Sequence, residues 1–60
     1  MMTMFRGYRG DDALLVDEEG TTITAPVALL RAAGLLELRT GQRLVVGIDD
    51  QGAVTEVGLP

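Results

Sequence analysis

The chain has 60 residues, 47% of them hydrophobic, and its nine acidic residues outnumber five arginines, which gives a net charge of −4. A chain of this length makes at most one domain and buries only about 60% of the surface that it exposes when unfolded. The chain contains neither cysteine nor histidine, so it cannot form a disulfide, a thiolate metal site or a histidine acid–base centre. The scarcity of basic residues argues against strong, non-specific binding to nucleic-acid phosphates.

The N-terminal segment does not have the pattern of a secretory leader, since no basic region precedes a continuous apolar stretch. No apolar run approaches the roughly 18 residues that a membrane-spanning helix needs. We therefore expect a cytoplasmic protein with no membrane association.

The first half of the chain predicts three short strands separated by turns. Residues Thr3–Arg9 form the first, and the turn Gly10–Asp12 follows it. Ala13–Val16 is an apolar run bounded by turn residues, which is typical of a buried strand. Thr21–Ala25 is rich in β-branched residues, so we expect it to form a hairpin with that run across the acidic turn between them.

A short helix, or a pair of tight turns, is predicted after the third strand. Pro26 ends that strand because it cannot donate to a ladder, and it suits the first turn of a helix. Val27–Ala33 is rich in the helix formers Ala and Leu, and Gly34 follows where a helix C-terminal glycine belongs.

Two further strands complete the chain. Arg43–Asp49 alternates apolar side chains on one face, and Ala53–Leu59 pairs with it as a hairpin. The sequence therefore predicts an all-β domain over residues 1–60: a small five-stranded OB-type antiparallel barrel with a short helical insertion between strands 3 and 4. The same element order also fits an SH3-like barrel.

The stretch Ala28–Leu44 resembles the pattern Ser-Ala-Leu-x-x-Ala-Gly-Leu-x-x-Leu-x-x-Gly-Gln-x-Val of bacterial cold-shock domains. Every spacing matches without a gap, and the turn Gly41–Arg43 is the most specific part. Gly52–Val57 resembles the closing strand of that family without its proline. The resemblance implies an OB-type barrel that binds single-stranded RNA or DNA. Gly20–Pro26 also resembles swapped-hairpin transcription-factor dimers of the AbrB type, but the link Leu36–Thr40 is too long for them.

The chain departs from the cold-shock pattern in its two binding motifs. Asp11–Val16 replaces Lys-Gly-Phe-Gly-Phe-Ile, and Ile23–Pro26 replaces Val-Phe-Val-His. Bases stack on exposed aromatic rings in such barrels, each ring contributing about 1–3 kcal/mol. The matching positions here hold Ala13, Leu15, Thr24 and Pro26. Any binding of single-stranded nucleic acid is therefore expected to be weak.

The remaining candidate residues for nucleic-acid binding are Arg6, Tyr8 and Arg9 in the first strand. Strand alternation places Arg6 and Tyr8 on one side, where they could stack a base and contact a phosphate, and Phe5 on the other side in the core. In the alternative interpretation, Tyr8 caps the barrel and Arg6 is solvated at its rim.

The sequence predicts no enzymatic function, and it predicts no bound metal or cofactor. The acidic clusters Asp11–Asp12, Asp17–Glu19 and Asp49–Asp50 fall in turns, which favour aspartate, and none has the spacing of a calcium loop. Arg39 and Arg43 are interpreted as solvated turn charges, and no nucleophile stands with a base.

A second hypothesis is a protein-interaction or regulatory module that kept the barrel and lost the nucleic-acid surface. If Ala13, Leu15 and Val45 are partly exposed, they form an apolar patch. Such patches often mark protein contacts, and this one would bind a second copy or another protein.

Overall fold

The computed structural model describes residues 1–60 and contains five strands and one helix. In chain order these are β1 (Met2–Arg9), β2 (Asp12–Asp17), β3 (Thr22–Pro26), α1 (Val27–Ala32), β4 (Arg43–Ile48) and β5 (Val54–Gly58). The prediction of five short antiparallel strands with a helical insertion between the third and the fourth is confirmed. Predicted and observed boundaries differ by one residue at most.

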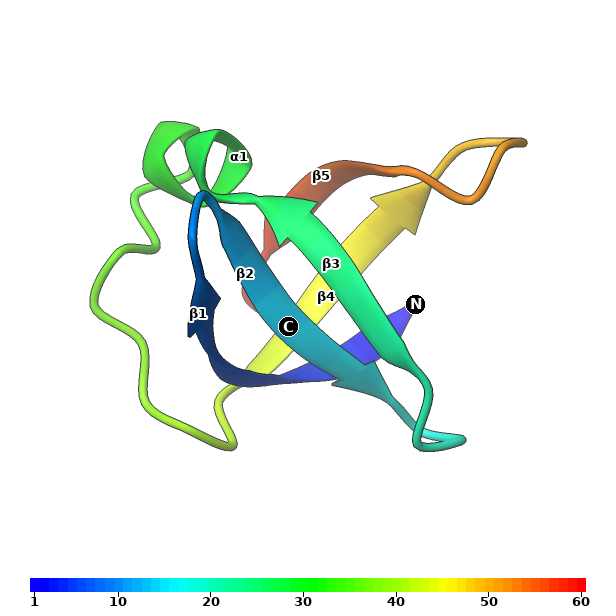
Figure 1. The fold of residues 1–60 in the computed structure, drawn as a ribbon, viewed down its shortest axis with the longest axis horizontal. Coiled ribbons are helices and arrows are strands. Elements are labelled where there is room, and N and C mark those ends of the chain that lie inside the picture. The colour runs from blue at the N-terminus through cyan, green and yellow to red at the C-terminus, as the bar shows by residue number, and fades with distance from the viewer.

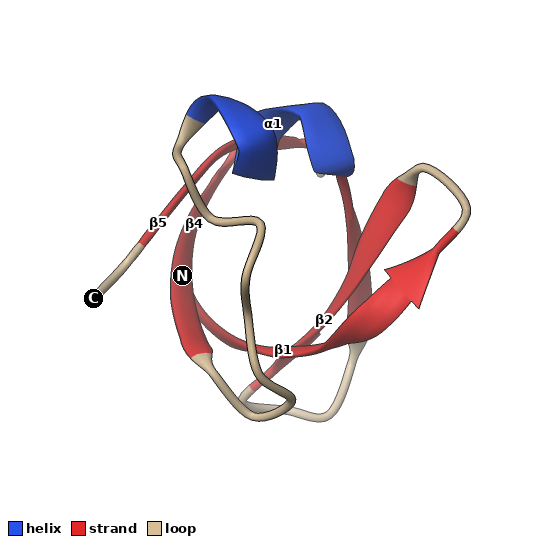
Figure 2. Ribbon diagram, turned by 90° about the vertical axis from the view of Figure 1, so that its left-hand side faces the viewer, coloured by secondary structure: helices blue, strands red, loops and turns tan.

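All five strands belong to one antiparallel sheet of order β3-β2-β1-β4-β5. Strand β1 joins the two halves, because it pairs with β2 along its length and with β4 through Met2–Met4. The sheet curls strongly, so that β3 and β5, at its two ends, come into contact (Figures 1 and 2). Helix α1 packs against both of these end strands. The architecture is a small all-β, barrel-like fold.

The core lies inside the curl and consists of alternate residues of the strands together with one helix residue. Its buried apolar members are Phe5, Ala13, Leu15, Ala25, Leu30, Leu44, Val46, Val54 and Val57. Thr3 is the one buried polar residue, and its hydroxyl donates to the carbonyl oxygen of Leu44 at 3.0 Å. No buried side-chain polar atom lacks a hydrogen-bond partner.

The β2–β3 and β4–β5 turns are built in the same way. In the first, Oδ1 of Asp17 accepts the backbone N–H groups of Glu19 and Thr21, each at 2.9 Å. In the second, Oδ1 of Asp49 accepts those of Gln51 and Ala53 at the same distances. The interpretation of these two acidic clusters as turn residues is confirmed.

Both ends of helix α1 are closed by backbone hydrogen bonds, the first to the β1–β2 turn and the second within the turn that follows the helix. The N–H of Val27 donates to the carbonyl of Asp11 at 2.9 Å, which fixes the helix start beside the β1–β2 turn. At the other end Gly34 adopts a φ of 75°, and Leu35 N–H donates to the Leu30 carbonyl at 2.8 Å. This is the pattern of a glycine-terminated helix. The helix has six residues, and no helix of the chain is long and apolar enough to cross a membrane.

Candidate functional site

A bulge in β1 determines where the predicted site residues lie. Phe5 pairs with Leu15 and Gly7 pairs with Leu14, so that Arg6 is an extra residue with no partner across the ladder. Gly7 has a φ of +154°, which a residue with a side chain rarely adopts. Such a bulge bends its strand and changes which side chains face inward.

Beyond the bulge, Tyr8 lies opposite the fully buried Ala13. Residues directly opposite each other in an antiparallel pair share a face, so Tyr8 belongs to the inner face, at the end of the barrel. Its ring meets that of Phe5 edge to face, with centroids 5.0 Å apart and an interplanar angle of 63°. Its hydroxyl donates to the carbonyl oxygen of Leu36 at 3.0 Å. The side chain nevertheless remains 46% exposed.

The expectation that Arg6 and Tyr8 share one side of the strand is wrong. Strict alternation would place residues two apart on the same face, but the extra residue in the bulge interrupts it. Tyr8 shares the face of Phe5 instead, and Phe5 is in the core as predicted, at 3% exposure. Arg6 and Arg9 are both exposed, Arg9 opposite Asp12 at the end of the ladder.

The residue that the structure brings to Tyr8 is Arg31, which the sequence did not single out. Both line an open groove of about 530 Å³ between the β1–β2 turn and α1. The other lining residues are Gly10, Asp11, Pro26, Val27, Ala28 and Leu36. Pairing of Asp12 with Pro26 carries the start of α1 to this turn, and the helical spacing of Ala28 and Arg31 then puts both on one helix face. That pairing, predicted as a hairpin, is the signal that could have identified Arg31.

The apolar patch expected from Ala13, Leu15 and Val45 does not exist. Ala13 and Leu15 are each 0% exposed, and only Val45 reaches the surface, at 38%. In the run Ala13–Val16 every residue is apolar, so the sequence did not reveal which alternate pair faces inward. Their pairing with Phe5 and Tyr8 puts Ala13 and Leu15 in the core, and Leu14 and Val16 face outward instead. Of the four positions at which cold-shock domains would stack bases, the two held by Ala13 and Leu15 therefore lie in the interior.

The groove supplies binding groups of three kinds. The half-exposed ring of Tyr8 offers a flat apolar surface, the guanidinium of Arg31 offers a cation with several donors, and Asp11 offers an acceptor. Elsewhere in the chain no three His, Cys, Asp or Glu side chains gather as a metal site would require.

No family model, curated protein or solved structure matches this chain. The fold and the groove define a small all-β, barrel-like domain with an aromatic and arginine-lined groove at one end. The resemblance of Ala28–Leu44 to cold-shock domains stays a prediction from residue spacing.

Proposed function

We propose that this chain is a divergent cold-shock-like domain of the OB type, cytoplasmic and non-enzymatic, that binds single-stranded RNA or DNA weakly. The observation that carries the proposal is the half-exposed ring of Tyr8, held in a groove that it shares with Arg31. A fixed aromatic ring beside a cation is the pairing by which barrels of this kind hold a base and its phosphate.

The orientation of Tyr8 supports this role. Its hydroxyl bond to Leu36 and its contact with Phe5 hold the ring in one position, so little side-chain freedom remains to be lost when a base stacks on it. Arg9 is exposed and directly precedes Gly10, which lines the groove, so it can contact the phosphate that continues from the groove, whereas Arg6 is exposed on the other face of the strand.

The expected affinity is low. One stacked base contributes about 1–3 kcal/mol, whereas the net charge of −4 repels the phosphate backbone. With Arg9 and Arg31 in contact, the slope of log K against log salt for single strands is expected at about −1.4, from roughly −0.7 per phosphate. Binding should therefore be detectable only at low ionic strength.

The test is a titration of labelled oligo-dT and oligo-rU at low salt, followed by fluorescence anisotropy. Tyr8→Ala removes the ring and is expected to weaken binding by a factor of about 5–150, the equivalent of 1–3 kcal/mol. Tyr8→Phe keeps the ring and should retain most of the affinity.

Arg31→Gln is compared with Arg39→Gln, which removes the same charge outside the groove. A larger loss for Arg31→Gln is expected, since Arg31 alone of the two lines the groove with Tyr8. Absence of binding by the wild type at high micromolar protein contradicts the proposed function. Equal losses for the two arginine variants show that the overall charge of the domain, and not the groove, determines the affinity.

A further inference from the structure

A second surface, on the outside of the sheet and independent of the Tyr8 groove, carries apolar side chains. Because Thr3 and Phe5 are buried, the alternate residues Met2 and Met4 of β1 point outward. Met4 lies opposite Val16 of β2 on one side and opposite Arg43 of β4 on the other, and Met2 lies opposite Val45. We call this surface, made of Met2, Met4, Val16 and Val45, the methionine face.

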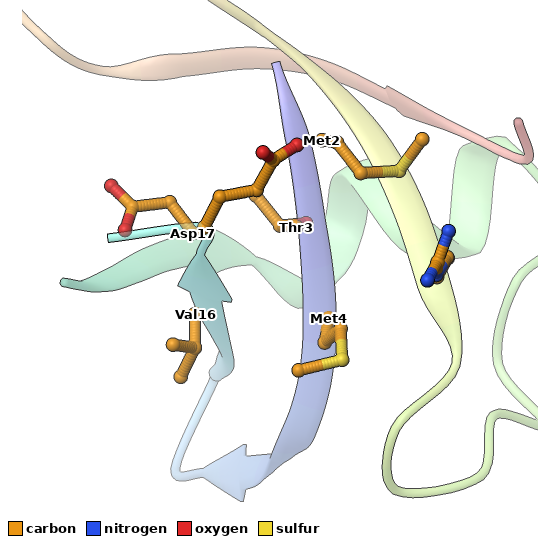
Figure 3. Close-up of a pocket in the computed structure, with 7 residues that line it drawn as sticks. Met2, Thr3, Met4, Val16 and Asp17 are labelled. Carbon is orange, nitrogen blue, oxygen red and sulfur yellow. The ribbon is translucent and has the colours of Figure 1, made fainter. Parts of the chain in front are cut away.

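The methionine face is exposed and partly hollowed. Met4 is 41% and Val45 38% exposed, and a depression of about 390 Å³ is lined by Met2, Thr3, Met4, Val16, Asp17, Glu18 and Arg43. Figure 3 shows Met2 and Met4 along β1, with Val16 and Asp17 on the neighbouring strand. Methionine is unbranched and polarisable, which suits surfaces that adapt to a partner.

Leu14 of β2, which is half-buried, continues the apolar character on the outside, but the two end strands are mostly polar there. On β3 the exposed outward positions are Thr22, Thr24 and Pro26, and on β5 they include Thr55 and Glu56. The outward side of a half-solvated antiparallel sheet is ordinarily polar in this way. An apolar surface confined to the middle of the sheet therefore needs an explanation other than packing within the chain.

The charged residues around the methionine face are mostly acidic, which favours a partner with basic side chains. Asp17 and Glu18 line one side of the depression, and Glu19 joins them around Met1 and Met2 in an adjoining hollow. The two hydrogen bonds that the Asp17 carboxylate accepts both use Oδ1, so Oδ2 has no partner within the chain. Arg43 is the single basic side chain among the residues that line the two hollows.

We propose that the methionine face binds a segment of another protein that presents apolar side chains flanked by lysine or arginine. The apolar side chains cover Met2, Met4 and Val16, and the cations meet Asp17 and Glu18. A second copy of this chain is disfavoured as the occupant, because two chains of net charge −4 repel each other. An anionic membrane surface is repelled for the same reason.

The test uses a fluorescein-labelled peptide, Gly-Lys-Leu-Lys-Gly-Leu-Lys-Gly, titrated with the whole chain at low ionic strength. Two matched peptides replace every Lys by Glu or every Leu by Ser. The basic apolar peptide is expected to bind at least about fivefold more tightly than either, because only it satisfies both the apolar surface and the carboxylates. Amide NMR shifts on binding should centre on Met2–Met4 and Val16–Glu18.

Two variants locate the surface on the protein. Met4→Ser removes an exposed apolar side chain and should weaken binding about fivefold, while the dispersion of the amide spectrum shows that the fold is kept. Glu18→Lys should weaken it about threefold or more. Its matched control is Asp50→Lys, the same charge reversal in the β4–β5 turn at a different corner of the molecule, which should change binding less than twofold (Figure 1).

Three results overturn the proposal. One is equal binding of the basic and the acidic peptide, and another is unchanged affinity in Met4→Ser. The third is self-association of the wild type by analytical ultracentrifugation that Met4→Ser abolishes, since this makes a second copy the occupant. Because Tyr8 lies outside the methionine face, Tyr8→Ala should bind the peptide like the wild type whatever its effect on nucleic acid.

Discussion

At the scale of single residues, Gly7 decides where the aromatic side chain of Tyr8 points. Its φ of +154° allows the bulge that makes Arg6 an extra residue, and the bulge turns Tyr8 to the face of Phe5. Nothing lies within 4 Å of the place that a Cβ atom of residue 7 would occupy, so the requirement for glycine is one of backbone conformation and not of space. A glycine that interrupts a strand pattern is thus a structural signal for the candidate site.

Gly7→Ala is therefore expected to destabilise the domain by about 1–3 kcal/mol, the range for a residue held in a rarely populated backbone conformation. The matched control is Gly58→Ala, at a strand glycine that has no positive φ. Nothing lies within 4 Å of the place that its Cβ atom would occupy. That variant should change stability by less than about 1 kcal/mol in either direction. Urea denaturation followed by circular dichroism measures both, and equal effects would show that the bulge conformation is not strained by a side chain.

At the scale of elements, α1 is too short to be stable by its own hydrogen bonds. Its six residues are well below the roughly 12–15 that an isolated helix needs in water. It persists because Leu30 is fully buried in the core and because the N–H of Val27 is bonded to the carbonyl of Asp11 in the β1–β2 turn. The groove depends on this anchoring, since Arg31 follows Leu30 directly.

Leu30→Ala is expected to destabilise the domain by about 2–5 kcal/mol, the cost of removing a buried leucine side chain and leaving a cavity. Leu59→Ala makes the same truncation at a site that is 61% exposed and should cost less than about 0.5 kcal/mol. Thermal denaturation of the two variants gives the comparison. Similar melting temperatures would mean that α1 contributes little to the core.

At the scale of the whole molecule, stability rests on nine buried apolar residues, because the chain has no cysteine to form a disulfide. A domain of this size with one small core is expected to have a free energy of unfolding of at most about 3–5 kcal/mol. Leu30→Ala should then leave a substantial unfolded fraction even without denaturant.

Urea denaturation of the wild type at two widely different protein concentrations measures this quantity. A single transition with the same midpoint at both concentrations is expected for a domain that folds alone. A midpoint that rises with concentration would show instead that association supplies part of the stability, and would direct attention to the methionine face as a contact between copies.

The sequence by itself determined the elements and their order. The aspartate and glycine turns, Pro26 and Gly34 act through hydrogen bonds and backbone angles within a few residues, so their effects can be predicted locally. The alternation in Arg43–Ile48 likewise predicted its inward face. The same local signals identified Tyr8 as a candidate and Phe5 as core.

Only the tertiary structure decided the register of the strands and, with it, which residues form the Tyr8 groove and the methionine face. The uniform apolar run Ala13–Val16 fits either face of a sheet, and its pairing with β1 across the bulge put Ala13 and Leu15 inside. Arg31 lines the same groove as Tyr8 only because the β2–β3 ladder carries α1 to the β1–β2 turn. Cross-strand pairing joins residues of separate segments, so no pattern within one segment encodes the register, and a shift of one residue reverses every side chain.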